Sequence, residues 1–242
     1  MDSILPNSKL RLYWNCILAV LITYSLMAVP FKLSFTEHQH GFYHPLIDLF
    51  IDIMLFIDII LNLRTTYYSK GVLVCDRKKI KNNYLKGWFT VDCISAFPID
   101  IIFIFFNWVP LFPAYSLIRI FRIFRIIRFF SSLKTILHFN ISLMRMLILA
   151  YLIMIYVHWI SCFWFFVGQW NAVHEANGWL VEHGLEKASI FSQYVTSLYW
   201  VITTMTTVGY GDITPTTDLE IIATMLVMVL GVSVYAYVIG NL

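Results

Sequence analysis

One stretch of this chain, residues 206–212, reads TTVGYGD and has the composition of a cation site built from main-chain oxygens. Its two glycines can adopt positive φ, so the carbonyls of residues 207–210 can face one side instead of alternating as they do in a strand. Such a row of carbonyls, with the Thr207 hydroxyl below it, can replace the water shell of a cation inside a bilayer. One chain supplies only one wall of such a site, so several copies must surround a shared axis, and a tetramer is the expected closure. The residues assigned to this site are Thr207, Val208, Gly209, Tyr210 and Gly211.

A second group consists of arginines at every third position of an otherwise apolar run, residues 114–130: Arg119, Arg122, Arg125 and Arg128. A charge at the centre of a bilayer costs at least a few kcal/mol, so these arginines need partners. An α-helix rotates the stripe by about 60° at each step, whereas a 3₁₀-helix aligns it on one face. The sequence leaves both geometries open. The stripe predicts a voltage sensor, and the alternative is a fixed ion-pair network that holds a helix bundle together.

Aspartates in two other apolar runs are the expected counter-charges of this stripe. Asp52 and Asp58 lie in the second run and Asp92 in the third. Asp48 shares a helix face with Asp52 because the two are four residues apart. Each of the two apolar runs has one end that we expect to face the cytoplasm, and Asp58 and Asp92 lie near those ends. We therefore expect these two to meet in an inner acidic site.

The elements that must position these groups are apolar helices. The chain of 242 residues is 60% hydrophobic and only 13% charged, about half the charge of a soluble domain. We expect an all-α membrane protein with a four-helix sensor-like domain (1–136) and a pore domain (137–242). The expected membrane spans are about 10–29, 45–63, 88–108, 114–130, 141–167 and 219–242, with a re-entrant pore helix at 190–206.

Prolines and polar segments are expected to end or bend these elements. Pro30 is expected to close the first span, and Pro98 to bend or interrupt the third. Residues 131–140 are expected to form a short connector between the two domains. Residues 168–188 are expected to form a polar extracellular turret after the fifth span.

The loop between the second and third runs is strongly basic. It contains Arg64, Lys70, Arg77, Lys78, Lys79, Lys81 and Lys86 against the single acid Asp76. This asymmetry places the loop, and with it both termini, in the cytoplasm of a protein of the plasma or inner membrane. A nucleic-acid site is not favoured, because the loop is short and lies between two spans. The sequence contains no nucleophile–base pair, phosphate loop or zinc-ligand spacing, so we expect no enzyme, no covalent cofactor and no metal other than the permeant cation.

Residues around the TVGYG stretch and in the last run are candidates for its support and gating. Tyr199 and Trp200 are expected to buttress it, with ordinary lipid-facing packing as the alternative. Asp212 could concentrate cations at the mouth, or brace Tyr210 and Trp200 through hydrogen bonds. Gly231 could be a hinge or a site of close packing. The candidates for an apolar gate that closes by dewetting are Tyr235, Val238 and Ile239.

Several stretches together resemble the channels that carry a cyclic-nucleotide-binding domain, a group that includes cyclic-nucleotide-gated, hyperpolarisation-activated and ether-à-go-go channels. They are DIILNLRT at 58–65, DCISAFPID at 92–100, the arginine triplets, YVIGN at 237–241 and the TVGYG filter of potassium channels. The resemblance implies a homotetramer with a central pore and a domain for cyclic nucleotide (cAMP or cGMP) after the sixth span.

The resemblance also frames what remains open. The chain ends at Leu242 without a polar tail, so we expect the nucleotide domain to lie outside it and nucleotide to bind no residue of this chain. The filter sequence favours selectivity for potassium, and the alternative is a weakly selective monovalent cation channel of the same family. A secondary transporter is less well supported, because it would usually show two related halves with paired interrupted segments.

Overall fold

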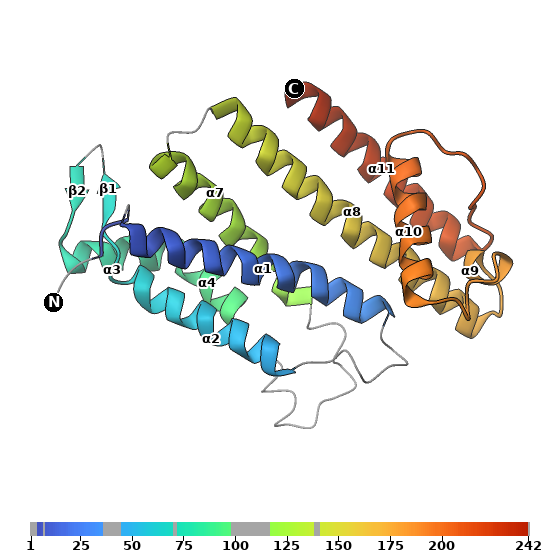
Figure 1. Cartoon of the computed structure of the whole chain (residues 1–242), viewed down its shortest axis with the longest axis horizontal. Helices are drawn as coiled ribbons and strands as arrows, with labels where there is room; N and C mark the ends of the chain where they lie inside the picture. Colours follow the sequence, from blue (N-terminus) through green and yellow to red (C-terminus); the bar gives the residue numbers. More distant parts are fainter. Residues whose placement is uncertain are drawn as a thin grey trace. The chain divides into compact units, whose positions relative to one another are not determined.

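The computed structural model describes residues 4–6, 8–35, 45–69, 72–97, 117–137 and 141–241, most of them helical (Figure 1). By their contacts the residues form two compact units. The first comprises Met1–Val29 with Tyr43–Ile141, and the second comprises Pro30–Phe42 with Ser142–Leu242.

The first unit packs short and long helices around an apolar core. Its elements are the first part of α1 (Lys9–Phe35), α2 (Pro45–Asn62), α3 (Arg77–Lys86), α4 (Phe89–Ala96), η2 (Leu117–Arg122) and α7 (Ile123–Leu137). Leu18, Ile22 and Leu26 recur every four residues on α1 and are buried, as expected for one face of a helix. Ile51 and Leu55 form a similar fully buried row on α2.

A small β-hairpin corrects the all-α expectation. Strands β1 (Tyr67–Ser69) and β2 (Val72–Val74) pair antiparallel, with Tyr67 opposite Val74. Ile4 adds an isolated parallel bridge to Thr65. The sequence analysis considered only the basic charge of this loop. It predicted neither the β-hairpin nor helix α3 within the loop.

Two helices continue past the residues expected to end them. Pro30 lies inside α1, which runs on to Phe35. The last turn is held by packing within the second unit, because the Phe35 ring stacks on Phe165 at a centroid distance of 3.9 Å. The domain connector is also shorter than expected, since α7 remains helical to Leu137.

The end of α4 agrees with the proline effect expected in the third run. The helix stops at Ala96, and Phe97 is extended, as sterics require of a residue that precedes proline. Pro98 itself and the rest of the third span, 98–108, lie outside the described residues.

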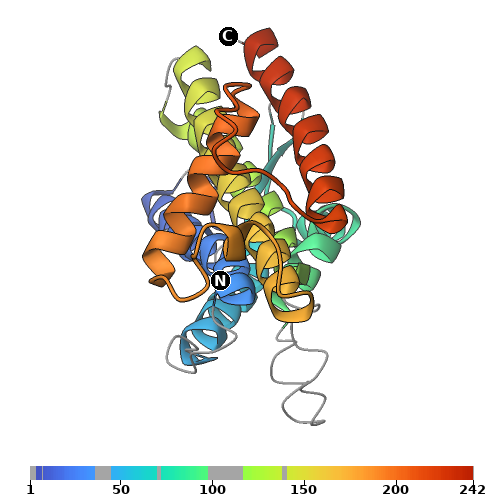
Figure 2. The same cartoon turned by 90° about the vertical axis from the view of Figure 1, so that its right-hand side faces the viewer.

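The second unit consists of the end of α1 with α8 (Ile141–His174), α9 (Trp179–Glu182), α10 (Ile190–Met205) and α11 (Asp218–Asn241). α10 packs against α11 (Figure 2). Three tryptophans form the centre of the core, where Trp164 stacks on Trp200 at 3.7 Å and on Trp179 at 5.6 Å between ring centroids. The turret expected at 168–188 therefore begins later than predicted, because α8 continues through Gly168 to His174.

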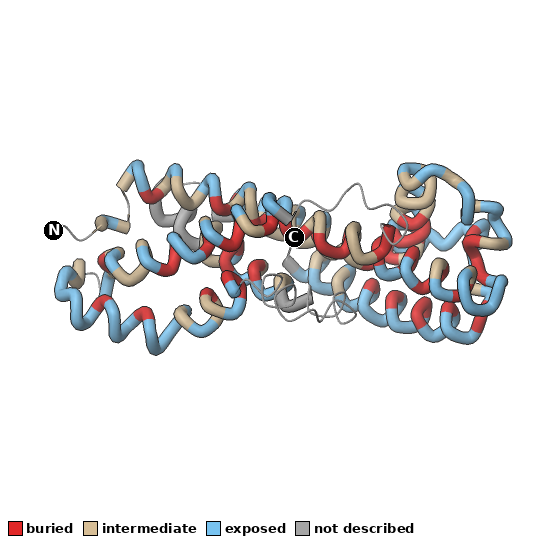
Figure 3. Tube along the Cα trace, turned by 90° about the horizontal axis from the view of Figure 1, so that it is seen from below, coloured by how far each residue is buried: buried red, intermediate tan, exposed pale blue. Residues whose placement is uncertain are grey.

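Three described helices are long and apolar enough to cross a membrane: Lys9–Phe35, Ser142–His174 and Asp218–Gly240. The shorter α2 has 18 residues and carries three aspartates. Buried and exposed residues alternate along the helices (Figure 3), and many exposed ones are large and apolar. The chain is an integral membrane protein, in which such side chains face lipid or other protein surfaces.

Candidate functional site

The arginine stripe uses both helix geometries that the sequence left open. Arg119 and Arg122 lie on the 3₁₀-helix η2, and Arg125 and Arg128 lie on the α-helix α7 that continues it. A 3₁₀-helix has three residues per turn, so the first two arginines share a face. The change to α geometry then turns the remaining arginines, so that the stripe curves around the helix.

The first half of the stripe, Arg119 and Arg122, pairs with the first turns of α2. Arg119 Nη1 lies 3.2 Å from Asp48 Oδ2, and Arg122 forms a hydrogen-bonded ion pair with Asp52. Arg122 is 1% exposed. Its remaining donors reach the Ser25 hydroxyl at 2.5 Å and the Ser95 carbonyl at 3.1 Å. A buried guanidinium thus has its charge and its donors satisfied together, as its burial requires.

The second half of the stripe, Arg125 and Arg128, meets both expected members of the inner acidic site. Arg125 Nε lies 3.1 Å from Asp92 Oδ1, and its Nη1 lies 3.6 Å from Asp58 Oδ2. Arg128 reaches the same two carboxylates, at 2.8 Å from Asp92 Oδ2 and 3.5 Å from Asp58 Oδ2. Arg125 also donates to the main-chain carbonyls of Asp92 at 2.7 Å and Leu55 at 3.2 Å. We call the four arginines and Asp48, Asp52, Asp58 and Asp92 the charge ladder.

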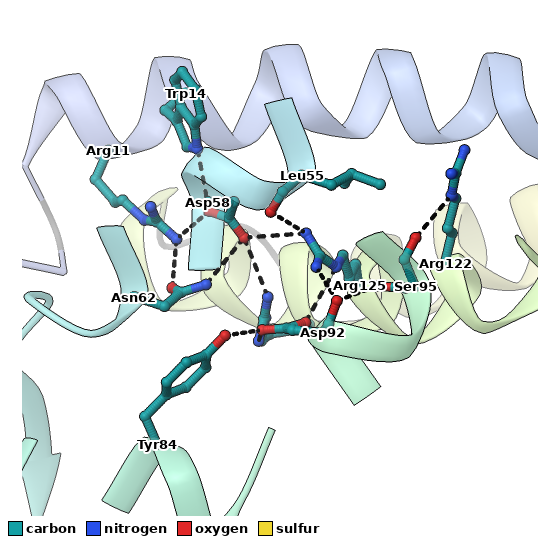
Figure 4. Close-up of polar contacts among 11 residues, drawn as sticks. Arg11, Trp14, Leu55, Asp58, Asn62, Tyr84, Asp92, Ser95, Arg122 and Arg125 are labelled. Atoms are coloured by element: carbon teal, nitrogen blue, oxygen red, sulfur yellow. Dashed lines mark hydrogen bonds and ion pairs between the residues drawn. The ribbon is translucent and has the colours of Figure 1, made fainter. Parts of the chain in front are cut away.

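Asp58 is also held from α1, by residues that sequence reasoning missed (Figure 4). Arg11 Nη2 donates to Asp58 Oδ1 at 2.8 Å, and Trp14 Nε1 donates to the same oxygen at 3.1 Å. Asn62 donates to Asp58 Oδ2 at 3.0 Å. A fixed cation thus occupies one carboxylate oxygen while ladder arginines approach the other. A signal existed, because Arg11 is the only charged residue within the expected span 10–29.

Asp92 is held from α3 in a similar way. Tyr84 donates its hydroxyl to Asp92 Oδ2 at 2.6 Å. Burial, followed by the hydrogen bond to Asp92, raises the pKa of Tyr84 above its ordinary value, so the hydroxyl stays a donor. The guanidinium of Arg128 also lies over the Trp88 ring, 5.6 Å from its centroid. Neither aromatic was anticipated, since contact across two helices leaves no periodic signal.

A cavity of about 130 Å³ with a mixed polar and apolar lining adjoins the inner acidic site. Its lining includes Arg11, Asp58, Asn62 and Arg128. One buried water needs roughly 10–15 Å³ and a few polar partners, so this cavity can hold several waters.

The TVGYG stretch has the backbone that its glycines predicted. φ is +54° at Gly209 and +76° at Gly211, and it is also +62° at Thr207. Val208 and Tyr210 have negative φ, so the sign alternates residue by residue. Alternation of this kind aligns successive peptide groups instead of flipping them. The amides of Val208 and Gly209 both donate to the Thr203 carbonyl, at 2.9 and 3.1 Å.

The residues expected to support the filter divide into two groups. Tyr199 donates to Asp212 Oδ2 at 2.6 Å, and its ring lies parallel to that of Tyr210 at 6.4 Å between centroids. The Trp200 ring, in contrast, is buried and stacks on Trp164. Within the described residues, Asp212 therefore braces the pore helix through Tyr199 rather than through Trp200.

The segment after the filter is tied to the turret. His183 is exposed, and both its ring nitrogens face main-chain oxygens, Nδ1 at 2.8 Å from Trp179 O and Nε2 at 2.9 Å from Asp212 O. The hydrogen bond to Asp212 raises the pKa of His183 above its ordinary value. Buried Glu220 of α11 accepts from the amides of Trp179 at 3.1 Å and Thr216 at 2.9 Å.

The structure places the gating candidates along an unbroken α11. Gly231 is buried, and a Cβ there would lie 3.3 Å from Met205 Cγ at the end of α10. Close packing, one of the two readings of this glycine, accounts for that contact. Tyr235 and Ile239 are exposed, and Val238 is half-buried, within the chain.

Comparison with known proteins gives a family and named relatives. A family model described as ion transport protein matches residues 11–242. The potassium voltage-gated channel unc-103 of Caenorhabditis elegans is 30% identical over 269 residues, covering 99% of this chain and 32% of that protein. The human voltage-gated delayed rectifier potassium channel KCNH5 is 30% identical over 276 residues, covering 98% and 26%. Rat KCNH1 is 29% identical over 265 residues, covering 94% and 26%. The chain thus spans a third or less of these curated relatives.

Proposed function

The chain belongs to the ion transport protein family, and on that premise we propose that it is one subunit of a homotetrameric, potassium-selective and voltage-sensing channel. Potassium passes down its electrochemical gradient and no covalent chemistry takes place. The chain is a member of an ion-channel family and not an enzyme. Its distant relatives are named as voltage-gated potassium channels, which supports the same activity.

The observation that carries the proposal is the alternating backbone at Thr207, Gly209 and Gly211. With the amides of Val208 and Gly209 engaged by the Thr203 carbonyl, the carbonyls of the stretch are available to a cation. A ring of four such walls replaces the hydration shell of potassium. Tyr199 and Asp212 hold the stretch from the pore helix, and Trp200 contributes indirectly through the tryptophan core.

The charge ladder supports the voltage-sensing part of the proposal. Each arginine of the stripe has an acidic partner, and the partners follow one another along the stripe from Asp48 through Asp52 to Asp92. An inward or outward step exchanges partners instead of stripping them away, which limits the cost of motion. Each charge that crosses the field gains about 2.3 kcal/mol per 100 mV, so three charges in four subunits supply tens of kcal/mol.

Orientation and regulation complete the proposal. The exposed basic residues of α3 lie in the cytoplasm under the positive-inside rule, and both termini lie on the same side. Movement of α11 opens the pore, with Tyr235, Val238 and Ile239 near the constriction and Gly231 at its packing contact with α10. Regulation by cyclic nucleotide is proposed for sequence outside residues 1–242, from the family resemblance alone.

The decisive measurement is the reversal potential with potassium on one side of a bilayer and sodium on the other. The filter predicts that potassium permeates at least about tenfold better than sodium, because the oxygen row replaces the potassium shell. Equal permeabilities would reject selectivity and favour the weakly selective cation channel. An absence of any single-channel current from the purified assembly would reject the channel itself.

A further inference from the structure

Helix α3 has a charge distribution that the proposed channel activity does not use. Its ten residues read RKKIKNNYLK, with five basic side chains and no acidic one. The basic residues Arg77, Lys78, Lys79, Lys81 and Lys86 are all exposed. Asp76 just before the helix is occupied as its N-cap, where it accepts from the Lys78 amide at 2.9 Å.

The opposite face of α3 is anchored in the first unit. Ile80 and Tyr84, four residues apart, are 2% and 9% exposed. α3 is therefore a fixed platform and not a loose basic loop. Leu85 and Trp88 at its end remain 39% and 44% exposed. Exposed cations with an exposed aromatic and an aliphatic side chain beside them are typical of a helix at a membrane surface.

The position of α3 along the chain sets the level at which it meets the bilayer. It ends at Lys86, and α4 begins at Phe89 with ladder residue Asp92 in its first turn. Under the proposed topology, α3 lies at the cytoplasmic headgroup layer. Acidic lipids give that leaflet a negative surface potential, which attracts basic segments beside a span.

We propose that α3 binds the acidic headgroups of phospholipids, and that Tyr84 transmits this binding to the charge ladder. The lysines supply the affinity, and Trp88 and Leu85 enter the boundary between headgroups and acyl chains. The topology of the proposed function is the one assumption carried over.

Tyr84 of α3 contacts the charge ladder directly. The Tyr84 hydroxyl lies 2.6 Å from Asp92 Oδ2, the oxygen that also receives Arg128 at 2.8 Å. Trp88, two residues past the end of α3, lies under the Arg128 guanidinium. A headgroup that shifts α3 therefore disturbs one contact of Arg128, with the Trp88 ring, and one contact of its partner Asp92, with the Tyr84 hydroxyl. Lipid composition then biases where the arginine stripe rests.

Binding is tested on the purified full chain in neutral detergent with short-chain phosphatidylglycerol, followed by intrinsic tryptophan fluorescence or thermal stabilisation. Each lysine near an acidic surface contributes about fivefold in affinity. Lys79→Gln should weaken binding by about that factor, and the triple variant Lys78→Gln, Lys79→Gln, Lys81→Gln by about a hundredfold. Lys187→Gln, an exposed lysine of the turret, is the matched control and should leave the affinity unchanged.

Four results would overturn the binding proposal, and the first three concern lipids and phosphate. They are an unchanged affinity in the triple variant, equal binding of short-chain phosphatidylcholine, and competition by inorganic phosphate at equal concentration, which would indicate a site for a free anion. Saturable binding of an acidic peptide or an oligonucleotide that excludes phosphatidylglycerol would also replace the membrane as the partner.

Coupling is tested in vesicles of phosphatidylcholine with or without one quarter phosphatidylglycerol. The wild-type chain should show different midpoints of voltage activation in the two lipids, and the triple variant should lose most of that difference. Tyr84→Phe keeps the ring and removes the donor to Asp92, so it should bind lipid as wild type does but lose at least half of the midpoint shift. A full shift in Tyr84→Phe would refute the coupling. Potassium current in both vesicles reports the channel itself, so failure of that activity is told apart from failure of lipid control.

Discussion

The ladder arginines differ from surface charges in how completely they are enclosed. Arg122 and Arg125 are 1% and 4% exposed, and each meets a carboxylate and main-chain or hydroxyl oxygens. Paired charges with such partners can be held inside a membrane, and they respond to its field. Arg128, the last arginine of the stripe, is 23% exposed in its side chain and lines the cavity beside Asp58. The ladder is thus enclosed at its centre and more open at its Arg128 end.

Neutralising Arg122 and Arg125 together should flatten the voltage dependence. Two of the four stripe charges are lost, so the slope of the conductance–voltage curve should fall to about half if the four share the field equally. Arg145→Gln on α8, an exposed arginine outside the ladder, should leave the slope unchanged. An unaltered slope in the double variant would point to a fixed ion-pair network.

Misfolding must be separated from lost gating charge in that experiment. Removing one member of a buried pair costs about 3–5 kcal/mol, because the other charge stays behind. Arg122→Gln with Asp52→Asn removes both members and should fold better than Arg122→Gln alone. It should still reduce the slope, and thermal unfolding followed alongside the current checks the comparison.

The His183 contacts predict a dependence on external pH. Both acceptors are carbonyl oxygens, so a neutral imidazole can donate to only one of them and an imidazolium to both. The hydrogen bond to Asp212 O raises the pKa, and the Glu182 and Asp212 carboxylates act in the same direction. The brace is therefore fully present below the ordinary pKa of about 6.5 and is lost as pH rises through the raised value.

Raising the external pH from about 6 to about 9 should accordingly speed the loss of potassium current during sustained opening, because Asp212 directly follows the filter. His183→Gln should remove this pH dependence. His174→Gln, which changes a second exposed histidine with one carbonyl contact, should preserve it. Retention of the full pH effect in His183→Gln would assign it to another group.

At the scale of single residues, the sequence predicted the features that follow a regular spacing or a known motif. The triplet spacing gave the stripe, and glycine chemistry gave the positive φ at Gly209 and Gly211. It did not give the positive φ of Thr207, because a threonine adopts that conformation only under constraint from its surroundings. Arg11 was missed for a related reason. Its partner Asp58 is 47 positions away and becomes a neighbour only when α1 and α2 pack together.

Among the elements, α8 depends on a glycine inside its span. A Cβ at Gly168 would lie 2.2 Å from Trp179 Nε1, a ring that is itself fully buried. Gly168→Ala should therefore destabilise the protein by about 1–3 kcal/mol through overpacking. Gly240→Ala is the control, since a Cβ there meets nothing within 4 Å and helix propensity improves. Thermal unfolding in detergent measures both, and equal melting temperatures would contradict the packing account.

The ends of the elements were harder to predict than their existence. Pro30 reads as a helix stop, yet ring stacking of Phe35 on Phe165 carries α1 one turn further. Gly168 reads as the start of a polar turret, yet it is the point where α8 accommodates the Trp179 indole. In both cases a tertiary contact outweighs a local signal of about 1–3 kcal/mol. Short α3 was hidden because its buried face consists of only Ile80 and Tyr84.

At the scale of the whole molecule, the filter stretch is open in a single chain. Val208 and Tyr210 are 53% and 71% exposed, and nothing lies within 4 Å of a Cβ placed on Gly209 or Gly211. Irregular backbone at membrane depth is tolerated only where protein or water covers it. A ring of identical chains supplies both the cover and the missing walls, and four is the number that the proposed function requires.

The number of subunits can be measured by co-expressing wild-type chains with a variant that does not conduct. Gly209 has φ of +54°, a conformation that costs an L-residue about 1–2 kcal/mol, so Gly209→Ala should distort the wall it belongs to and stop conduction. If one faulty wall blocks the shared path, equal expression of Gly209→Ala and wild-type chains leaves only all-wild-type rings active. Relative to the wild-type chain alone at the same total expression, random assembly then leaves about one sixteenth of the potassium current if the channel has four subunits. It leaves about one quarter if the channel has two. Co-purification of the two chains with different tags must show that Gly209→Ala assembles. A residual current near one half would mean that each chain conducts alone, because only then does a faulty chain leave its neighbours untouched.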